Sequence, residues 1–361
     1  MPNKLNYLKK IFPGVTLALV FYLFSQGINN LLAIEIFGTL KSPISTVLIA
    51  ILLGILMGNA FTPRPGMMIG LDFTQQYILK LGIIFLGIRL SFEEFIKFGS
   101  IAIPLIIFCI VGVLILIKLL IKKVPISSKM SYLIAIGTSV CGATAIVATA
   151  PVINAKKTEV AYAIANITLF GVIAMLVYPY FAEWYFNDSA LKTGLFLGTS
   201  IHETSQVAAA GLIYDQQFNS PETLNVATVT KLIRNTFLII MIPLFAFLYN
   251  RGKIKTKKYS LLSIFPYFVL GFIGMIIVRN LGDQLFSIEN NNHYIWISVI
   301  DYLEILATAF LTMAMAAVGI SINLSELKSM GYKPFLVGLI AAVTVGFISL
   351  LYIETISKFF I

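Results

Sequence analysis

The sequence predicts an all-α polytopic membrane protein. Of its 361 residues, 58% are hydrophobic and only 12% are charged, whereas an ordinary soluble domain carries about 25% charged residues. The mean hydropathy is +0.92. Apolar stretches long enough to cross a hydrocarbon core of about 30 Å recur from one end of the chain to the other. No length remains for a sizeable soluble domain, so residues 1–361 are expected to form a single membrane domain.

Eleven apolar segments are expected. In order they are 11–29, 45–60, 73–90, 100–121, 130–154, 158–182, 190–213, 223–249, 261–279, 301–322 and 334–356. The first follows Lys4, Lys9 and Lys10 as a signal peptide would, but no small-residue cleavage site comes after it. Residues 1–60 are therefore assigned to accessory N-terminal spans that stay in the protein.

The net charge of +10 indicates topology and not nucleic-acid binding, because most Lys and Arg residues lie in short loops between apolar segments. The most basic loop contains Arg251, Lys253, Lys255, Lys257 and Lys258. The positive-inside rule makes this loop cytoplasmic. The N-terminus is expected to be cytoplasmic too. The expected location is a bacterial cytoplasmic (inner) membrane, with lipid as the surrounding partner.

The fifth and seventh segments share a motif, GTSVCGATAIVATA from Gly137 and GTSIHETSQVAAAG from Gly198. Backbone that stops being helical inside a membrane must line a cavity or be buried in protein. Each segment either crosses as a broken helix or returns as a re-entrant hairpin. Loop charges favour hairpins, because these place Lys156 and Lys157 on the cytoplasmic side.

Weak internal repetition also favours hairpins. GIRLSFEE from Gly87 resembles GISINLSE from Gly319, and the fifth and sixth segments resemble the seventh and eighth, with Pro179 and Pro243 at matching ends. Repeat 1 is expected at about 73–182 and repeat 2 at about 190–356, the second being circularly permuted. Only hairpins make every pair inverted, as transporter repeats often are.

Substrate-binding residues are expected in both copies of the motif. The first copy supplies Thr138, Ser139, Cys141, Gly142 and Thr144, and helix N-termini beginning there would direct free amides at an anion. The second copy supplies Thr199, Ser200 and Gln206. Small residues can also serve only for close helix packing. Two cognate clusters nevertheless favour a binding site.

The second copy also contains His202 and Glu203. Ionisable residues in an apolar segment need partners or water, and these two can exchange protons with a transported solute. The alternative is structural: Glu203 forms an ion pair with Lys231 or Arg234, and His202 caps a helix. The sequence leaves both interpretations open.

Lys231 and Arg234 are three residues apart in the eighth segment and so share one helical face. Two cations on one face repel each other unless an anion or a carboxylate lies between them. They are therefore predicted to bind an anionic substrate. The alternative is that they snorkel to a membrane surface.

The sequence contains no sign of an enzyme. It has no phosphate-binding loop after a strand, no HExxH helix and no supported Ser, His and Asp set. Cys109 and Cys141 lie within apolar segments without metal-ligand spacing, so no metal and no cofactor are expected. Paired breaks with ionisable residues favour a carrier over a channel.

Five ordered motifs resemble the sulfate exporter family of bacterial inner-membrane proteins, the YeiH-like proteins. They are LGIIFLGIRLSF from Leu81, GTSVCGATAIVATAPVINA from Gly137, GTSIHETSQVAAAG from Gly198, VTKLIRN from Val229 and MAMAAVGISINLSEL from Met313. The resemblance implies a secondary transporter related in fold to the cation/proton antiporters and bile-acid symporters, exporting sulfate or a sulfonate-like anion. In those relatives the interrupted helices cross the membrane, which opposes the hairpin interpretation.

Two functions are carried forward. The favoured one is a membrane transport domain that moves a small anion and is coupled to protons through His202 or Glu203. The alternative is a sodium-coupled organic acid carrier or a cation/proton antiporter, in which Glu203 binds the cation. The direction of transport and the formation of a homo-oligomer are left open.

Overall fold

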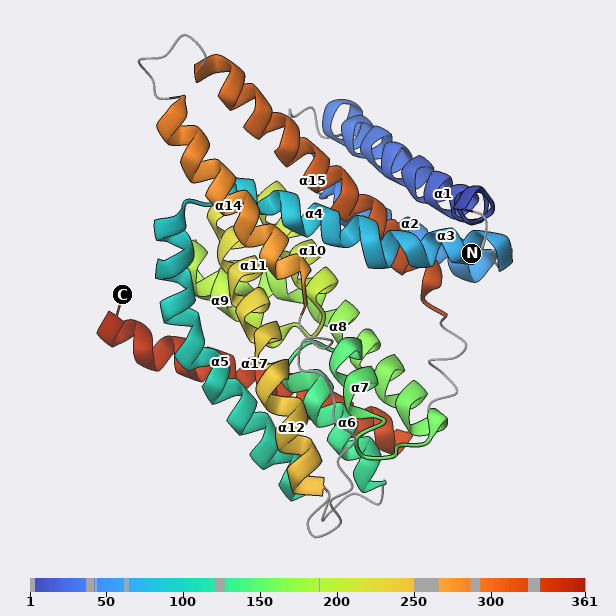
Figure 1. Ribbon diagram of the computed structural model, residues 1–361, viewed down its shortest axis with the longest axis vertical. Helices are drawn as coiled ribbons and strands as arrows, with labels where there is room; N and C mark the ends of the chain where they lie inside the picture. Colours follow the sequence, from blue (N-terminus) through green and yellow to red (C-terminus); the bar gives the residue numbers. More distant parts are fainter. Residues whose placement is uncertain are drawn as a thin grey trace. The chain divides into compact units, whose positions relative to one another are not determined.

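The computed structural model describes residues 4–36, 42, 44–61, 65–120, 127–187, 189–249, 266–286, 293–323 and 332–360. The described residues form helices joined by turns and short loops, with no strand among them (Figure 1). The chain divides into two compact units. Unit 1 consists of Met1–Phe95, Leu212–Pro221 and Tyr267–Leu324, and unit 2 of Ile96–Gly211, Glu222–Pro266 and Ser325–Ile361.

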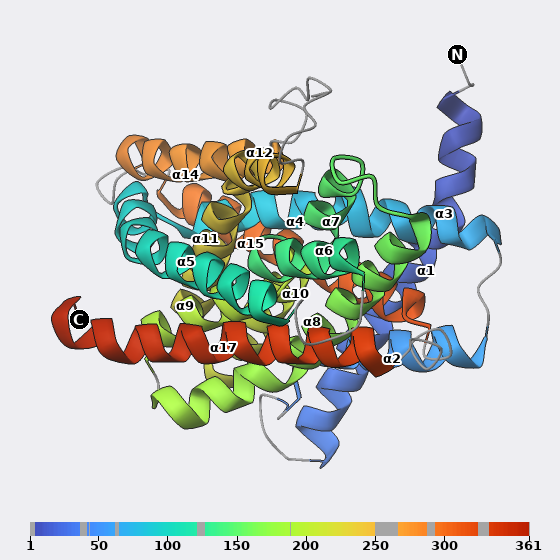
Figure 2. The ribbon, with the colours of Figure 1, turned by 90° about the horizontal axis from the view of Figure 1, so that it is seen from below.

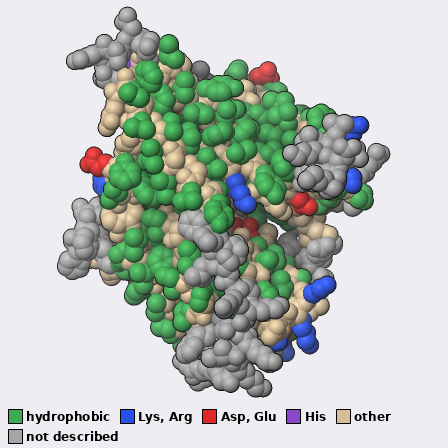
Figure 3. Space-filling view, in the orientation of Figure 1, with side chains coloured by type: hydrophobic (Ala, Val, Ile, Leu, Met, Phe, Trp, Pro, Cys, Tyr) green, Lys and Arg blue, Asp and Glu red, His purple; other side chains and the backbone are tan. Residues whose placement is uncertain are grey.

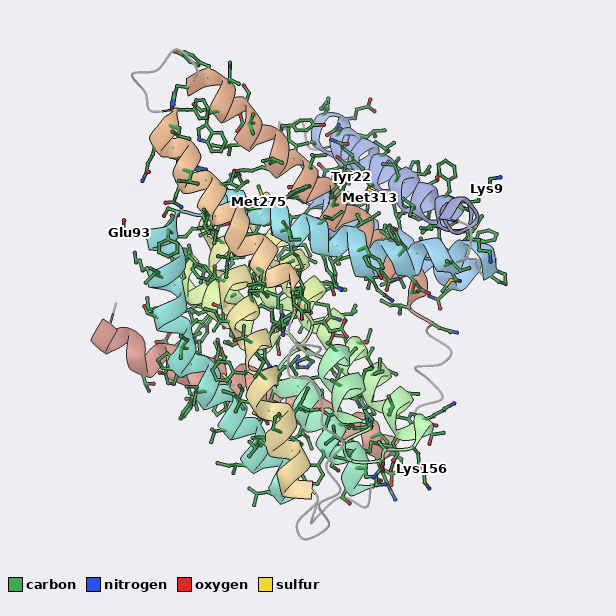
Figure 4. The ribbon with its side chains drawn as sticks, in the orientation of Figure 1. Lys9, Tyr22, Glu93, Lys156, Met275 and Met313 are labelled. Carbon is green, nitrogen blue, oxygen red and sulfur yellow. The ribbon has the colours of Figure 1, made fainter. Side chains whose placement is uncertain are left out.

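Unit 1 is built mainly from helices at the beginning of the chain and two helices near its end. They are α1 (Lys4–Leu31), η1 (Leu32–Ile36), α2 (Thr46–Ala60), α3 (Pro65–Phe73), η2 (Thr74–Ile78), α4 (Leu79–Leu86), η3 (Gly87–Arg89), α14 (Phe268–Leu285) and α15 (His293–Ser321). Helix α15 packs against α2 and α4, and α1 packs against α3. Tyr22 of α1 packs against the hydrophobic cluster that contains Met313 of α15 (Figure 4).

Small residues let α2 and α15 approach with their backbones in contact. A Cβ added to Gly54 would lie 2.6 Å from the carbonyl oxygen of Ala316, and one added to Gly58 would lie 2.1 Å from that of Ile320. Such close crossings are typical of membrane helices, whose association depends on packing because lipid offers no hydrophobic driving force.

Unit 2 contains most of the central helices and the last one. They are α5 (Phe92–Leu120, from Ile96 onward), α6 (Ser128–Ser139), α7 (Ala143–Thr149), α8 (Lys157–Phe186), α9 (Ala190–Ser200), α10 (Thr204–Phe218, up to Gly211), α11 (Pro221–Thr236, from Glu222), α12 (Leu238–Tyr249) and α17 (Tyr332–Phe360). Helix α17 packs along α8, α9 and α6 (Figure 2).

The first GTS segment is a re-entrant hairpin made of α6 and α7. Lys129, in the first turn of α6, donates from Nζ to the carbonyl of Asn154 beyond α7 (2.6 Å). Ser127 donates from Oγ to Oε1 of Glu159, at the start of α8. The segment therefore returns to the side from which it entered, and α8 leaves from the same place.

The second GTS segment, α9 and α10, is also a hairpin. Oγ1 of Thr223, near the start of α11, donates to the carbonyl of Ala190, at the start of α9 (3.4 Å). Gly198, near the end of α9, faces Ala227 and Thr230 of α11. Helices α9 and α11 therefore run parallel. Helix α10, which follows α9 in the chain and precedes α11, runs in the opposite direction. Both segments are therefore re-entrant. The family resemblance implied that the interrupted helices cross the membrane at these two positions, and the structure corrects that expectation.

The two hairpins open to opposite sides of unit 2, because α8 separates them. The first hairpin lies beside the start of α8, whereas the ring of Phe196 in α9 packs on Tyr178 and Phe186 near the end of α8. Each hairpin is followed by a long helical run, α8 or α11–α12. This is the inverted arrangement of the fifth and sixth segments against the seventh and eighth, although the full repeat boundaries stay a prediction.

Eight helical runs among the described residues are long and apolar enough to cross a membrane. They are Lys9–Glu35, Pro65–Arg89, Phe92–Leu116, Lys157–Phe186, Pro221–Phe245, Phe268–Leu285, His293–Ser321 and Tyr332–Thr355. Helix α2, at 15 residues, is shorter. Hydrophobic side chains dominate the described part of the surface in Figure 3. The all-α polytopic membrane fold is confirmed, but eleven separate spans are not.

Three expectations stay predictions. The cytoplasmic position of the N-terminus and the accessory role of residues 1–60 are untested, as is the treatment of the whole chain as one domain. The basic loop at residues 251–258 lies outside the described residues.

The hairpins predict the sidedness of three exposed positions in unit 2, Ser128, Lys156 and Glu222. In a chain without its two native cysteines, a cysteine at Ser128 and one at Lys156 should react with an impermeant maleimide from the same side, and one at Glu222 from the opposite side. Labelling of sealed cells before and after permeabilisation measures this. Broken helices that cross would give the reverse pairing, with Lys156 and Glu222 together.

Candidate functional site

The first hairpin turns at a residue that must be glycine. Helix α6 ends at Ser139 and α7 begins at Ala143, and between them Gly142 has φ +66° and ψ −129°. Residues with a Cβ rarely adopt this conformation. A Cβ there would also lie 2.5 Å from Cγ of Glu203. The tip of the first hairpin, residues 140–142, is therefore shaped to receive the tip of the second.

The second hairpin turns at residues 201–203, between the end of α9 and the start of α10 at Thr204. Glu203 reaches the first hairpin, because its Oε1 accepts a long hydrogen bond from the backbone N–H of Ala143 (3.4 Å). The two tips thus meet inside unit 2. They lie opposite the middle of α8, where Gln206 Nε2 donates to the carbonyl of Thr168 (3.3 Å).

Lys231 joins the two tips. Its Nζ donates to the carbonyls of Val140 in the first tip (3.0 Å) and of Ile201 in the second (3.0 Å), and also to the carbonyl of His202. An ammonium has three N–H donors, so every donor of Lys231 is used. The side chain is fully buried.

Arg234 joins the same tips one turn further along α11. Its Nε donates to the carbonyl of Ser139 (2.9 Å) and its Nη2 to that of Thr138, both in the first hairpin. Its Nη1 donates to the carbonyls of Thr199 (2.5 Å) and Ile201 (3.2 Å) in the second hairpin. This residue is also fully buried.

These contacts cap two helix ends. The last carbonyls of α6 and α9 have no partner within their own helices, and they form the negative ends of the helix dipoles. Lys231 and Arg234 supply both the hydrogen bonds and the opposite charge. The two cations are thus held side by side by helix C-termini. Both are fully buried, so the alternative in which they snorkel to a surface is wrong.

Glu203 and Gln206 form a cap on the other half of the second hairpin. The Oε1 of Gln206 accepts a hydrogen bond from the backbone N–H of Glu203 (3.2 Å) at the start of α10. A Cβ added to Gly171 of α8 would lie 2.0 Å from this oxygen, so α8 has room for Gln206 only because residue 171 is glycine. No ion pair of the described residues joins Glu203 to Lys231 or Arg234.

His202 is buried at the second tip with 1% of its surface exposed. Its backbone carbonyl is fixed by Lys231, but neither ring nitrogen has a hydrogen-bond partner among the described residues. A buried polar group without a partner is rare in folded proteins. The ring therefore does not cap a helix, which was the structural alternative, and both of its nitrogens remain available to a ligand.

Several predicted hydroxyls instead bond to their own helices. Ser139 and Ser200 donate to the carbonyls three and four residues earlier, and Thr199 donates to Leu195. Of the remaining predicted residues, Thr138 is buried with its hydroxyl unpartnered and Cys141 is buried. Thr144 is exposed on α7, outside the buried cluster.

The structure adds three polar residues to those predicted. Thr199 Oγ1 lies 2.7 Å from Ser349 Oγ of α17. Asn235 of α11 donates from Nδ2 to Oγ1 of Thr204 (2.9 Å). Thr230 is buried with an unpartnered hydroxyl. Asn235 and Thr230 flank the two cations in sequence, which is the signal that identifies them, whereas Ser349 lies in an ordinary apolar run.

Comparison with known proteins places these residues in a family context. The family model described as conserved hypothetical protein 698 matches residues 17–338. The UPF0324 membrane protein FN0533 of Fusobacterium nucleatum is 33% identical over 88% of this chain and 91% of its own length. The UPF0324 membrane protein SAG1125 of Streptococcus agalactiae is 36% identical over 80% and 83%. The UPF0324 inner membrane protein YeiH of Escherichia coli K12 is 32% identical over 82% and 81%.

The conformation of Gly142 predicts a specific loss of stability. Gly142→Ala should lower the free energy of unfolding by about 1 to 3 kcal/mol or more, because the backbone is strained and Glu203 must move. Gly274→Ala is the control, since a Cβ at this helical position would contact nothing within 4 Å. Denaturant titration in detergent compares the two, and equal stabilities would contradict the proposed fit of the tips.

Removing the Arg234 guanidinium should be more costly. Arg234→Leu leaves the buried carbonyls of Thr138, Ser139 and Thr199 without their side-chain donor, because only the carbonyl of Ile201 keeps a second donor in Lys231. Each unsatisfied group costs about 1 to 3 kcal/mol. Arg279→Leu removes one ion pair with Asp283, which is 45% exposed, and one hydrogen bond to the carbonyl of Ile88, so it should cost only about 1 to 2 kcal/mol. Thermal denaturation of both purified variants measures the difference. A loss no larger for Arg234→Leu would show that the tips do not depend on this cap.

Proposed function

Because this chain belongs to the family described as conserved hypothetical protein 698, with relatives named membrane proteins, we propose that it is a secondary transporter of a small anion. Sulfate or a sulfonate-like anion is the proposed substrate, and the cytoplasmic membrane is the proposed location. The substrate proposal comes from the resemblance of the five sequence motifs and from the charge of the buried site.

One observation carries the proposal: an excess of buried positive charge where the hairpin tips meet. Lys231 and Arg234 bring two cations, and Glu203 is the one carboxylate in either tip. Uncompensated charge is expensive at this depth, since α11 places Lys231 about 15 Å from its start. The dipoles of the two helix C-termini offset part of this charge, and a small anion would offset the rest.

Unpartnered polar atoms support a ligand in the same region. The hydroxyls of Thr138 and Thr230 and both ring nitrogens of His202 are buried without a partner among the described residues. Hydroxyl and imidazole N–H groups donate well to an oxyanion. These residues come from the first hairpin, the second hairpin and α11. These are the same three elements that Lys231 and Arg234 join.

Coupling is assigned to the second tip. His202 and Glu203 are its ionisable side chains, and Glu203 also touches the first tip through Ala143. A proton taken up by either residue would change the charge that the anion meets. We propose a carrier and not an enzyme, with no cofactor. The second candidate stays a sodium-coupled organic acid carrier or a cation/proton antiporter.

Proteoliposomes containing the purified protein should take up labelled sulfate when a pH gradient is imposed. Glu203→Gln keeps the shape of the side chain but cannot ionise, so gradient-driven uptake should fall to the level of empty liposomes. Glu222→Gln, at an exposed carboxylate in the first turn of α11, is the matched control and should transport normally.

The same assay with sulfite, thiosulfate, taurine and carboxylates defines the substrate class. Folded protein that moves none of these anions, with or without a gradient, would refute the anion carrier. Flux that requires sodium, is lost in Glu203→Gln and is little affected by Lys231→Ala would favour the second candidate, in which Glu203 binds the cation.

A further inference from the structure

Three backbone carbonyl oxygens converge on the Lys231 ammonium. They belong to Val140 of the first tip and to Ile201 and His202 of the second. In secondary transporters, unwound carbonyls and the C-terminal ends of half-helices coordinate the coupling sodium ion. Neutral oxygens of this kind replace the hydration shell of a monovalent cation. The Lys231 side chain thus ends where such an ion would be coordinated.

We propose that the carbonyls of Val140, Ile201 and His202 form a monovalent-cation site that the Lys231 ammonium fills permanently. The chain would then carry, as a side chain, the cation that a sodium-coupled carrier takes from solution.

The charges around the site favour a single positive charge there. Arg234 lies beside it and shares the carbonyl of Ile201 with Lys231. A divalent ion would add a second charge next to the guanidinium, whereas a monovalent ion leaves the total unchanged. Glu203, Cys141 and the neutral or charged imidazole of His202 are the other ionisable groups that interact with Lys231. Sodium in place of the ammonium would therefore meet the same electrostatic surroundings.

The carbonyls also require an occupant. They lie at the broken ends of two helices in the buried interior of unit 2, where no bulk water satisfies a free carbonyl. When Lys231 is shortened, the carbonyls of Val140 and His202 lose their side-chain donor, and that of Ile201 keeps only its bond from Arg234. The other three bonds of Arg234 go to carbonyls outside this set. A sodium ion from solution is the simplest replacement.

This inference rests on the proposed transport function for one consequence only, the choice of coupling ion. A carrier whose sodium site is filled by its own ammonium has no use for sodium from solution. Such a carrier would couple to protons through the second tip. The binding proposal itself does not require transport.

Thermal-shift measurements in sodium chloride and in choline chloride test the site directly. Wild-type protein should melt at the same temperature in both salts. Lys231→Ala should melt lower in choline and recover as sodium is added, by about 5 °C at a hundredfold excess over the dissociation constant. Lys231→Met, whose side chain fills the space without a charge, should not respond to sodium. Lys192→Ala removes a partly exposed lysine and is the matched control.

Lys231→Ser provides a second route if Lys231→Ala cannot be purified, since it also empties the site and its hydroxyl can bind a water molecule on the sodium ion. The proposal is overturned if the folded variants are indifferent to sodium, or if wild-type protein responds as strongly as they do. Failure of both variants to fold even in sodium would also count against it, because sodium should restore the missing contacts.

Sulfate flux in the same proteoliposomes separates this proposal from the transport function. A sodium-stabilised Lys231→Ala protein in a preparation whose wild type moves no anion would retain the cation site and refute the carrier. If the wild type transports sulfate and the Lys231→Ala variant is indifferent to sodium, the carrier is supported and the cation site is refuted.

Discussion

Unit 2 depends on the attachment of two hairpin tips to one face of α11. Lys231 and Arg234 together donate seven hydrogen bonds to backbone carbonyls of the first and second hairpins. Helix ends inside a membrane have no water to satisfy them. Two long cationic side chains, one turn apart, solve this problem for both hairpins. The same bonds fix the tips against each other, because each cation contacts both.

The fold around this attachment follows from the alternating direction of the two hairpins and of the long helices that come after them. The first hairpin and α8 enter from one side, and the second hairpin and α11 enter from the other. Both hairpins therefore end at the same depth, opposite the middle of α8. Glycine is needed where the parts come closest, at Gly142 beneath Glu203 and at Gly171 beneath Gln206. An anion site of the kind proposed would form at this depth because that is where the backbone is interrupted.

Much of the candidate site could be predicted from residue type and spacing. The two cognate GTS clusters meet as expected, and Lys231 and Arg234 are close to both. The partners could not be predicted. A cation beside polar residues suggests a ligand or a carboxylate, but nothing in the sequence distinguishes either of these from the carbonyls of a helix end. The hydroxyls of Ser139, Thr199 and Ser200 mislead in a similar way, since Ser and Thr can bond to their own helix.

The sequence by itself determined that this is an all-α membrane protein and that two of its apolar segments are interrupted, because composition and apolar length report burial in lipid directly. Loop charges and repeats also favoured hairpins over crossing helices, although only weakly. The tertiary structure alone decided that both segments return, through contacts such as Ser127 with Glu159 that join residues far apart in the chain. It alone showed what the buried cations bind, since backbone carbonyls are present at every residue and only the fold determines which of them lack a partner.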